Sequence, residues 1–176
     1  MRILFLLLVI LTIPGVTGCG YNFAGMVPVR LPANVELLNI SEVQNPTQEV
    51  WLEAYLRSNF RDEISRRAEV TWVDENEAEA LVHIQVERLR TSDGLIGVDD
   101  RLVRVDVRID MEIFMLDALT QERIWSSGIA RGTSSYHVAR EEIVVPGEPG
   151  PAHRQAVEEA VDDALRRATD RLGHVF

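Results

Sequence analysis

The segment from Val103 to Met115 constrains the fold of this chain more than any other. Seven apolar residues occupy every second position within it. The positions between the first six of them are all charged: Arg104, Asp106, Arg108, Asp110 and Glu112. A period of two is that of a β-strand and leaves little room for a helix. The segment therefore predicts a long strand with one packed face and one face against water or a polar partner.

Four other segments have the pattern of strands. Shorter strands are expected at 34–40, 70–73 and 80–90, where β-branched and aliphatic residues gather. A return strand at 123–131 should pair with the long strand as a hairpin. The segment 138–150 is rich in proline and glycine, and we expect it to be irregular.

Two helices complete the pattern. Asn45 is a suitable N-cap with Pro46 in the first turn, and apolar residues spaced by three and four extend from there to about Arg67. The second helix should begin at Pro151 and end at Gly173. Since one sheet face is polar, both helices should cover the other face. The expected fold is an α+β two-layer sandwich, with two helices packed on one face of a mostly antiparallel, mixed sheet of about four strands.

The first 18 residues have the build of a secretory signal peptide. Arg2 precedes an apolar run at 3–13, and Pro14-Gly15 interrupts that run. The run is too short to span a membrane. Val16-Thr17-Gly18-Cys19 then resembles the lipobox of bacterial lipoproteins. That resemblance implies cleavage after residue 18 and acylation of Cys19.

The lipobox implies a location on a membrane surface. Cys19 is the single cysteine of the chain, so it has no internal disulfide partner. Two or more acyl chains anchor a protein stably, whereas one is marginal. Related lipoproteins kept at the inner membrane often carry Asp after the cysteine. Gly20 in that place favours the periplasmic side of the outer membrane, with 19–33 as a lipidated linker and 34–176 as a single domain.

The chain is acidic and contains no lysine. It has 28 Asp and Glu residues against 18 basic ones, for a formal net charge of −10. This balance argues against nucleic-acid binding through bulk charge. The exclusive use of arginine fits either GC-rich codon usage or phosphate recognition, to which the planar guanidinium is suited.

The residue types that carry catalysis are dispersed. The histidines at 83, 137, 153 and 174 include no pair with metal-ligand spacing, and there is no second thiol. The Asp residues at 93, 99 and 100 lack the spacing of a calcium loop. A glycine-rich phosphate loop, a G-x-S-x-G elbow and an H-E-x-x-H motif are all missing from the sequence. We therefore expect a non-catalytic binding or assembly protein with no metal or cofactor.

The expected hairpin tip, 91–100, combines apolar and basic features. Antiparallel pairing should bring four arginines together at its base, and apolar residues occupy the tip itself. Such a tip suits a ligand that is both apolar and anionic, for example a phosphorylated glycolipid. The candidate ligand-binding residues are Arg88, Arg90, Arg101, Arg104, Leu95 and Ile96. Alternatively, the loop folds back and the arginines pair with Asp93, Asp99 and Asp100.

The mature N-terminus also carries a family resemblance. Cys19-Gly20-Tyr21-Asn22-Phe23-Ala24-Gly25 resembles the start of the LPS-assembly lipoproteins of the LptE type. The likeness continues through the strand at 35–40, the helix with Leu52, Leu56 and Phe60, the segment 78–82, and Ile124-Trp125. It covers most of the mature chain.

This resemblance implies a non-catalytic outer-membrane lipoprotein. In the family, such a protein sits as a plug inside a large outer-membrane β-barrel of the LptD type. It binds lipopolysaccharide during transport to the cell surface. The polar sheet face would then lie against a polar barrel interior.

Two other kinds of protein share this opening. Lipoproteins related to the curli-secretion and penicillin-binding-protein-activator families begin with a similar lipobox, strand, helix and strand. They would be a secretion-pore subunit or an activator of cell-wall synthesis. A lipid carrier acting alone in the periplasm is a third possibility and would need a cavity.

The anchor gives the first testable prediction. Cys19→Ala should yield an uncut or unlipidated protein, because no other residue supplies a thiol for the diacylglycerol. Mass spectrometry of the mature N-terminus checks this. A wild-type chain that starts elsewhere without acyl mass would contradict the assignment.

Overall fold

A computed structural model of the chain describes residues 31–96, 102–139 and 150–174. Its five strands form one sheet in the order β2-β1-β3-β4-β5. The strands are β1 (Leu37–Gln44), β2 (Thr71–Trp72), β3 (Ala80–Ile96), β4 (Leu102–Asp117) and β5 (Arg123–Ala139). The helices are α2 (Leu52–Arg67) and α3 (Pro151–Asp170), and short 3₁₀ turns lie at Pro32–Asn34, Glu75–Glu77 and Arg171–His174.

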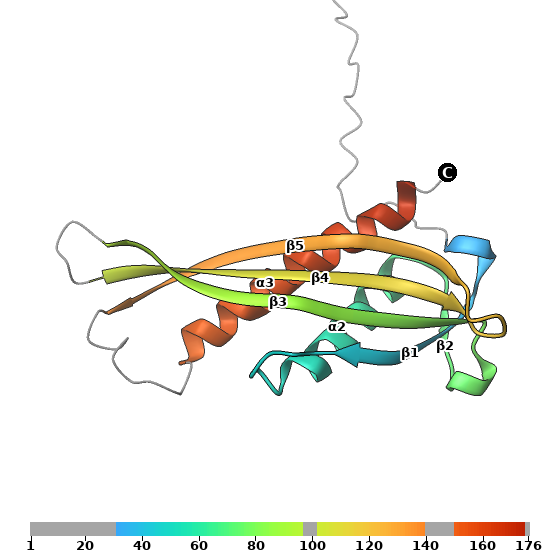
Figure 1. The fold of residues 1–176 in the computed structure, drawn as a ribbon. Helices are drawn as coiled ribbons and strands as arrows, with labels where there is room; N and C mark the ends of the chain where they lie inside the picture. The colour runs from blue at the N-terminus through green and yellow to red at the C-terminus, as the bar shows by residue number, and fades with distance from the viewer. Residues whose placement is uncertain (1–30, 97–101, 140–149, 175–176) are drawn as a thin grey trace, which may run out of the picture.

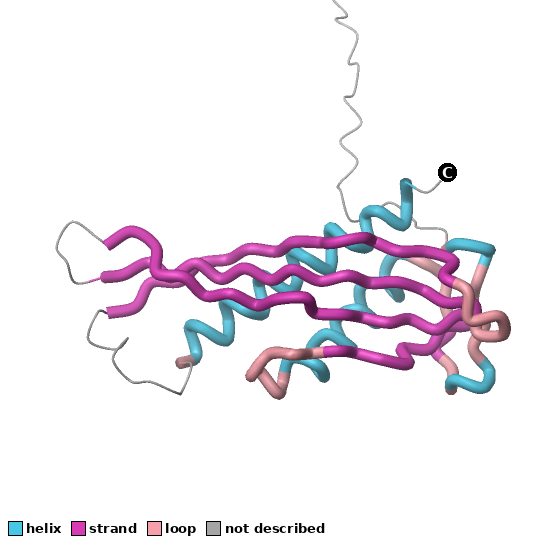
Figure 2. The backbone as a smooth tube through the Cα atoms, viewed as in Figure 1, coloured by secondary structure: helices cyan, strands magenta, loops and turns pink. Residues whose placement is uncertain are grey.

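The expected α+β sandwich is confirmed. Strand β1 runs parallel to β2 and β3, whereas β3, β4 and β5 are antiparallel neighbours, so the sheet is mixed. Both helices lie on one side of it (Figures 1 and 2). The sheet has five strands where about four were expected, because the short strand expected at 70–73 joins it as β2 and pairs with Leu37 and Leu38 of β1.

Several element boundaries differ from the sequence expectation. The first strand spans 37–44 and not 34–40, and the return strand continues to Ala139 and does not end at Arg131. The first helix begins at Leu52 and not at Asn45. The Asn45 side chain instead accepts hydrogen bonds from the backbone N–H and the hydroxyl of Thr47, and donates to the carbonyl of Glu49. A short polar side chain that bonds to its own following backbone stabilises a turn at the expense of a helix. The hairpin strands also run further than expected, so 91–96 belongs to β3 and not to a loop.

The core lies between the sheet and the helix layer. The odd-numbered residues of β4 from Val105 to Met115 are at most 3% exposed, as the period of two predicts. The helices contribute matching stripes, with Leu56, Phe60 and Ile64 from α2 fully buried. Neither helix in the described ranges is long and apolar enough to cross a membrane.

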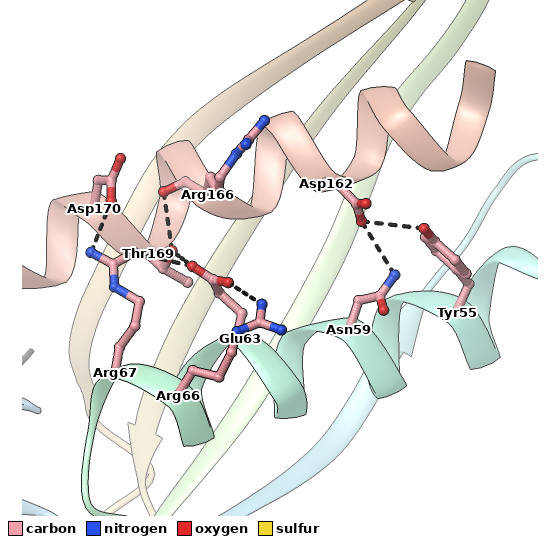
Figure 3. Close-up of polar contacts among 9 residues, drawn as sticks. All are labelled: Tyr55, Asn59, Glu63, Arg66, Arg67, Asp162, Arg166, Thr169 and Asp170. Atoms are coloured by element: carbon pink, nitrogen blue, oxygen red, sulfur yellow. Dashed lines mark hydrogen bonds and ion pairs between the residues drawn. The ribbon is translucent and has the colours of Figure 1, made fainter. Parts of the chain in front are cut away.

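A polar seam joins the two helices (Figure 3). Arg67 is buried and bonds to Glu63 at 3.3 Å, to the Thr169 hydroxyl at 2.8 Å and to Asp170 at 2.8 Å. These three partners come from both helices, so the guanidinium ties the end of α2 to the end of α3. Removing one partner from a buried charge network is costly because the remaining charge stays desolvated.

Asp162 of α3 belongs to the exposed part of this seam. Its carboxylate accepts hydrogen bonds from Tyr55 at 3.2 Å and from Asn59 at 3.3 Å. Burial raises the pKa of Asp162, and burial together with this carboxylate raises the pKa of Tyr55 to about 12. On the same helix, Asp163 pairs with Arg167 at 3.0 Å.

Helix α3 approaches β5 closely at Gly132. A Cβ at this position would lie 1.8 Å from the carbonyl oxygen of Ala160 and 2.7 Å from the backbone nitrogen of Ala164. The helix also satisfies the free edge of β5. Asp163 accepts the Thr133 N–H at 3.3 Å, and Arg171 donates to the Ser127 and Ile129 carbonyls. Three backbone groups of the sheet edge are thereby satisfied.

The close approach predicts a large effect from one methyl group. Gly132→Ala should lower the free energy of unfolding by about 1–3 kcal/mol or more, because the helix backbone must move away from the sheet. Chemical denaturation measures the change. Gly150→Ala is the matched control, since a Cβ there meets nothing within 4 Å. Its cost is limited to that of a less favoured N-cap residue, below about 1 kcal/mol. Equal losses in the two variants would contradict the described packing.

Candidate functional site

The polar face of the sheet is hollowed into a groove of about 860 Å³. The groove lies on the outer halves of β3, β4 and β5, beyond the last pairing of β1 with β3 at Gln85. Its charged and hydroxyl-bearing lining residues are Arg90, Arg104, Arg108, Asp106, Thr91, Ser92, Thr133, Ser134 and Ser135. We refer to this site as the arginine groove.

Strand register places the groove residues side by side. Arg108 of β4 lies opposite Arg90 of β3 on one side and Thr133 of β5 on the other. One row further along, Asp106 lies between Ser92 and Ser135. Directly opposed residues on one sheet face have Cβ atoms roughly 4.5–5.5 Å apart. Two guanidinium side chains therefore project from adjacent positions into the same space.

Arg90 and Arg108 form a like-charged pair that has no ion-pair partner among the described residues. Like charges directly opposite each other destabilise a sheet. Their juxtaposition at the floor of a groove therefore favours an external anion as their partner.

The neighbouring row shows the opposite arrangement. Asp110 lies between Arg88 and Arg131 in the register, and its carboxylate accepts a hydrogen bond from Arg131 at 2.6 Å. That bond lowers the pKa of Asp110, and the nearby charges of Arg131, Arg88 and Arg108 lower it further. Because the pKa is depressed in the folded state, the pair stabilises the fold above the ordinary Asp range. The stabilisation is lost as the pH falls through the folded-state pKa.

The structure unites some of the predicted ligand residues and separates others. Arg90 and Arg104 line the groove, whereas Arg88 lies in the next row beside Asp110. Arg101 and Cys19 lie outside the described residues. Leu95 and Ile96 belong to β3, and their side chains are not among those described.

Arg108 is the groove residue that sequence reasoning missed. The alternation of β4 already placed it on the polar face, but only the register shows that it opposes Arg90. The alternative expectation was that the arginines pair with acidic residues of the tip, and Arg104 does not follow it. Arg104 pairs with Asp106 of its own strand at 2.8 Å, while Asp99 and Asp100 lie outside the described residues.

A second polar cluster surrounds His83 at the other end of the same face. Its Nε2 lies 3.1 Å from the Ser41 hydroxyl, and its Nδ1 lies 3.2 Å from the Glu42 carboxylate. Its ring stacks on Phe114 at 5.0 Å. This hydrogen-bond order is that of a serine–histidine–acid relay, but the hollow beside it has a volume of only about 10 Å³. That is no more than the space of one water molecule. We assign these contacts the local role of holding the bulge at Ser41.

The chemistry of the arginine groove is that of anion recognition. Guanidinium groups bind phosphate and carboxylate oxygens through paired N–H donors, and hydroxyl groups add further donors. Three or more His, Cys, Asp or Glu side chains do not gather as a metal site anywhere in the described part of the chain. The donor set therefore suits a multiply charged oxyanion.

Comparison with known proteins shows a shared fold. No family model and no curated protein matches the chain. A candidate lipoprotein of Caulobacter crescentus CB15 matches with a TM-score of 0.50 at 16% identity, over 77% of this chain and 88% of that one. Lipoprotein B of Nitrosomonas europaea gives 0.47 at 15% identity, over 85% and 86%. A PelC dodecamer from Paraburkholderia phytofirmans gives 0.43 at 12% identity, over 84% and 92%.

The like-charged Arg90–Arg108 pair predicts that removing one arginine stabilises the fold. Arg90→Gln should raise the free energy of unfolding by about 0.2–1 kcal/mol at low salt, because the repulsion from Arg108 is removed. The gain should shrink at high salt as the charges are screened. Arg131→Gln serves as the control and should destabilise the fold, since it removes the partner of Asp110. Denaturant titrations at two salt concentrations measure both, and a destabilised Arg90→Gln protein would contradict the described register.

Proposed function

We propose that the protein is a non-catalytic, lipid-anchored lipoprotein of the outer membrane that binds lipopolysaccharide through the arginine groove. The observation that carries the proposal is the like-charged Arg90–Arg108 pair, which forms no ion pair within the described residues, at the floor of a hydroxyl-lined groove. We further propose that a large β-barrel of the LptD type holds the domain as a plug while the glycolipid moves to the cell surface.

The groove suits phosphorylated glycolipid better than a simple inorganic anion. A volume of about 860 Å³ exceeds what one phosphate fills and is of the size of a small-molecule site. The guanidinium groups match phosphate oxygens, and the hydroxyls of Ser92, Thr133 and Ser135 can bond to sugar hydroxyls. A phosphorylated saccharide offers both kinds of partner.

The membrane anchor rests on the sequence around Cys19. A signal-peptide build followed by Gly18-Cys19 supports acylation of the cysteine and retention on a membrane surface. The description of the Caulobacter protein as a candidate lipoprotein agrees with this part of the proposal. A lipid anchor would hold the groove close to the glycolipid it binds.

The polar sheet face supports the barrel partner. The lumen of an outer-membrane barrel is polar, and this face carries paired charges in which the arginine is exposed, such as Arg131 with Asp110 and Arg123 with Glu112. A face of this kind can lie against a polar wall without leaving buried charges unpaired. The apolar face is already covered by the protein's own helices.

Charge reversal in the groove tests the ligand. Arg90→Glu with Arg108→Glu should weaken binding of lipopolysaccharide by roughly a hundredfold or more, because charge-assisted contacts contribute about 1.5–3 kcal/mol each. The loss should be greater at low salt. Arg61→Glu with Arg166→Glu is the matched control, since it makes the same change of net charge on exposed sites of the helix layer. A binding isotherm that overlays the wild type would refute the glycolipid assignment.

Affinity purification from detergent-solubilised membranes tests the partner. The proposal expects a large outer-membrane barrel to co-purify with the lipidated chain. Rings of the chain itself would favour a secretion-pore subunit, and a cell-wall synthase would favour an activator. Either of these would replace the plug assignment.

A further inference from the structure

The arginine groove contains two cationic positions with different surroundings. Arg104 and Arg108 lie four residues apart on β4, and alternation places both on the polar face. At a rise of 3.2–3.4 Å per residue, their Cα atoms are separated by about 13 Å along the strand. Arg90 joins Arg108 across the strands, whereas Arg104 has no arginine opposite it in the register.

Asp106 lies between these two positions and forms an ion pair at only one of them. Its carboxylate accepts a hydrogen bond from Arg104 Nε at 2.8 Å, and it forms no ion pair with Arg108 within the described residues. The two paired side chains are 49% and 46% exposed, so the contact is a solvated one. Such pairs are weak, at about 0.2–1 kcal/mol. An incoming anion can therefore displace Asp106 from Arg104.

We infer that the groove holds two phosphate subsites, one open at Arg90 and Arg108 and one at Arg104 that its internal counter-ion Asp106 occupies until a second phosphate displaces it. This inference rests on the proposed binding of phosphorylated glycolipid. It adds that the ligand carries two phosphates, presented at the two ends of a saccharide. Asp106 sets how much the second phosphate contributes to affinity.

The two subsites should respond differently to a ligand with a single phosphate. That ligand can bind at Arg90 and Arg108 without displacing any group of the protein. A ligand with two phosphates must also compete with Asp106 and meets the repulsion of its carboxylate. Neutralising Asp106 should therefore increase the affinity for the ligand with two phosphates and leave that for the ligand with one phosphate unchanged. The gain equals the free energy of the Arg104–Asp106 pair, which no longer has to be broken.

The experiment compares diphosphoryl and monophosphoryl lipid A, each in the same detergent, on the full mature chain. Asp106→Asn should increase affinity for diphosphoryl lipid A by roughly threefold to fivefold, as expected for release of an exposed pair. Affinity for the monophosphoryl form should change by less than about twofold. Arg104→Gln should reduce the ratio of the two affinities to near one while binding of the monophosphoryl form persists.

Asp110→Asn is the matched control. It removes the same carboxylate from the same face of β4, but Asp110 pairs with Arg131 and does not line the groove. It should therefore leave the ratio of the two affinities unchanged, and thermal melts confirm that each variant is folded. Equal changes for both lipids in Asp106→Asn, or an unchanged ratio in Arg104→Gln, would overturn the two-subsite inference and leave glycolipid binding standing. A wild-type protein that binds neither lipid would overturn both.

Discussion

The packing of α3 against one face of β4 and β5 is the contact on which the remaining structure depends. The period of two in β4 gives the sheet one apolar face, and α3 crosses that face and packs on β4 and β5. Gly132 lets the helix backbone approach the strand directly. Asp163 of this helix and Arg171 of the turn that follows it also bond to backbone groups at the edge of β5, so the same segment covers the core and satisfies part of an edge that could pair with another chain.

Packing both helices on one face leaves the other face available for recognition. The three long strands extend past β1 and α2 (Figure 1), so their outer halves form a three-stranded platform with α3 beneath it. Side chains on the polar face of that platform do not contribute to the core, and their types are free to vary without loss of the fold. The arginine groove lies on this part of the sheet, supported by rigid strands and not by a loop. Rigid support limits the entropy lost when a ligand binds.

The sequence predicted the order of elements and the two-layer architecture, because both follow from local periodicity. It did not predict where α2 begins, since Asn45 is equally suited to cap a helix or to form a turn, and only the surrounding packing selects the turn. The groove was predicted only in part. Arg90 and Arg104 were recognised from their position near a hairpin, but their relation to Arg108 depends on register. The register of β3 shifts at a bulge between Val86 and Arg88, and no local pattern predicts such a shift.

The like-charged pair also shows why the groove is better explained by function than by folding. Across the same three strands, the row of Arg88, Asp110 and Arg131 alternates in sign and stabilises the sheet. The row of Arg90, Arg108 and Thr133 could have done the same with one acidic residue, and nothing in the core prevents that choice. A position that breaks a local rule without a structural reason is expected at a functional site. The repulsion between Arg90 and Arg108 is a small cost to the free protein, and an anion bound between them would convert it into attraction.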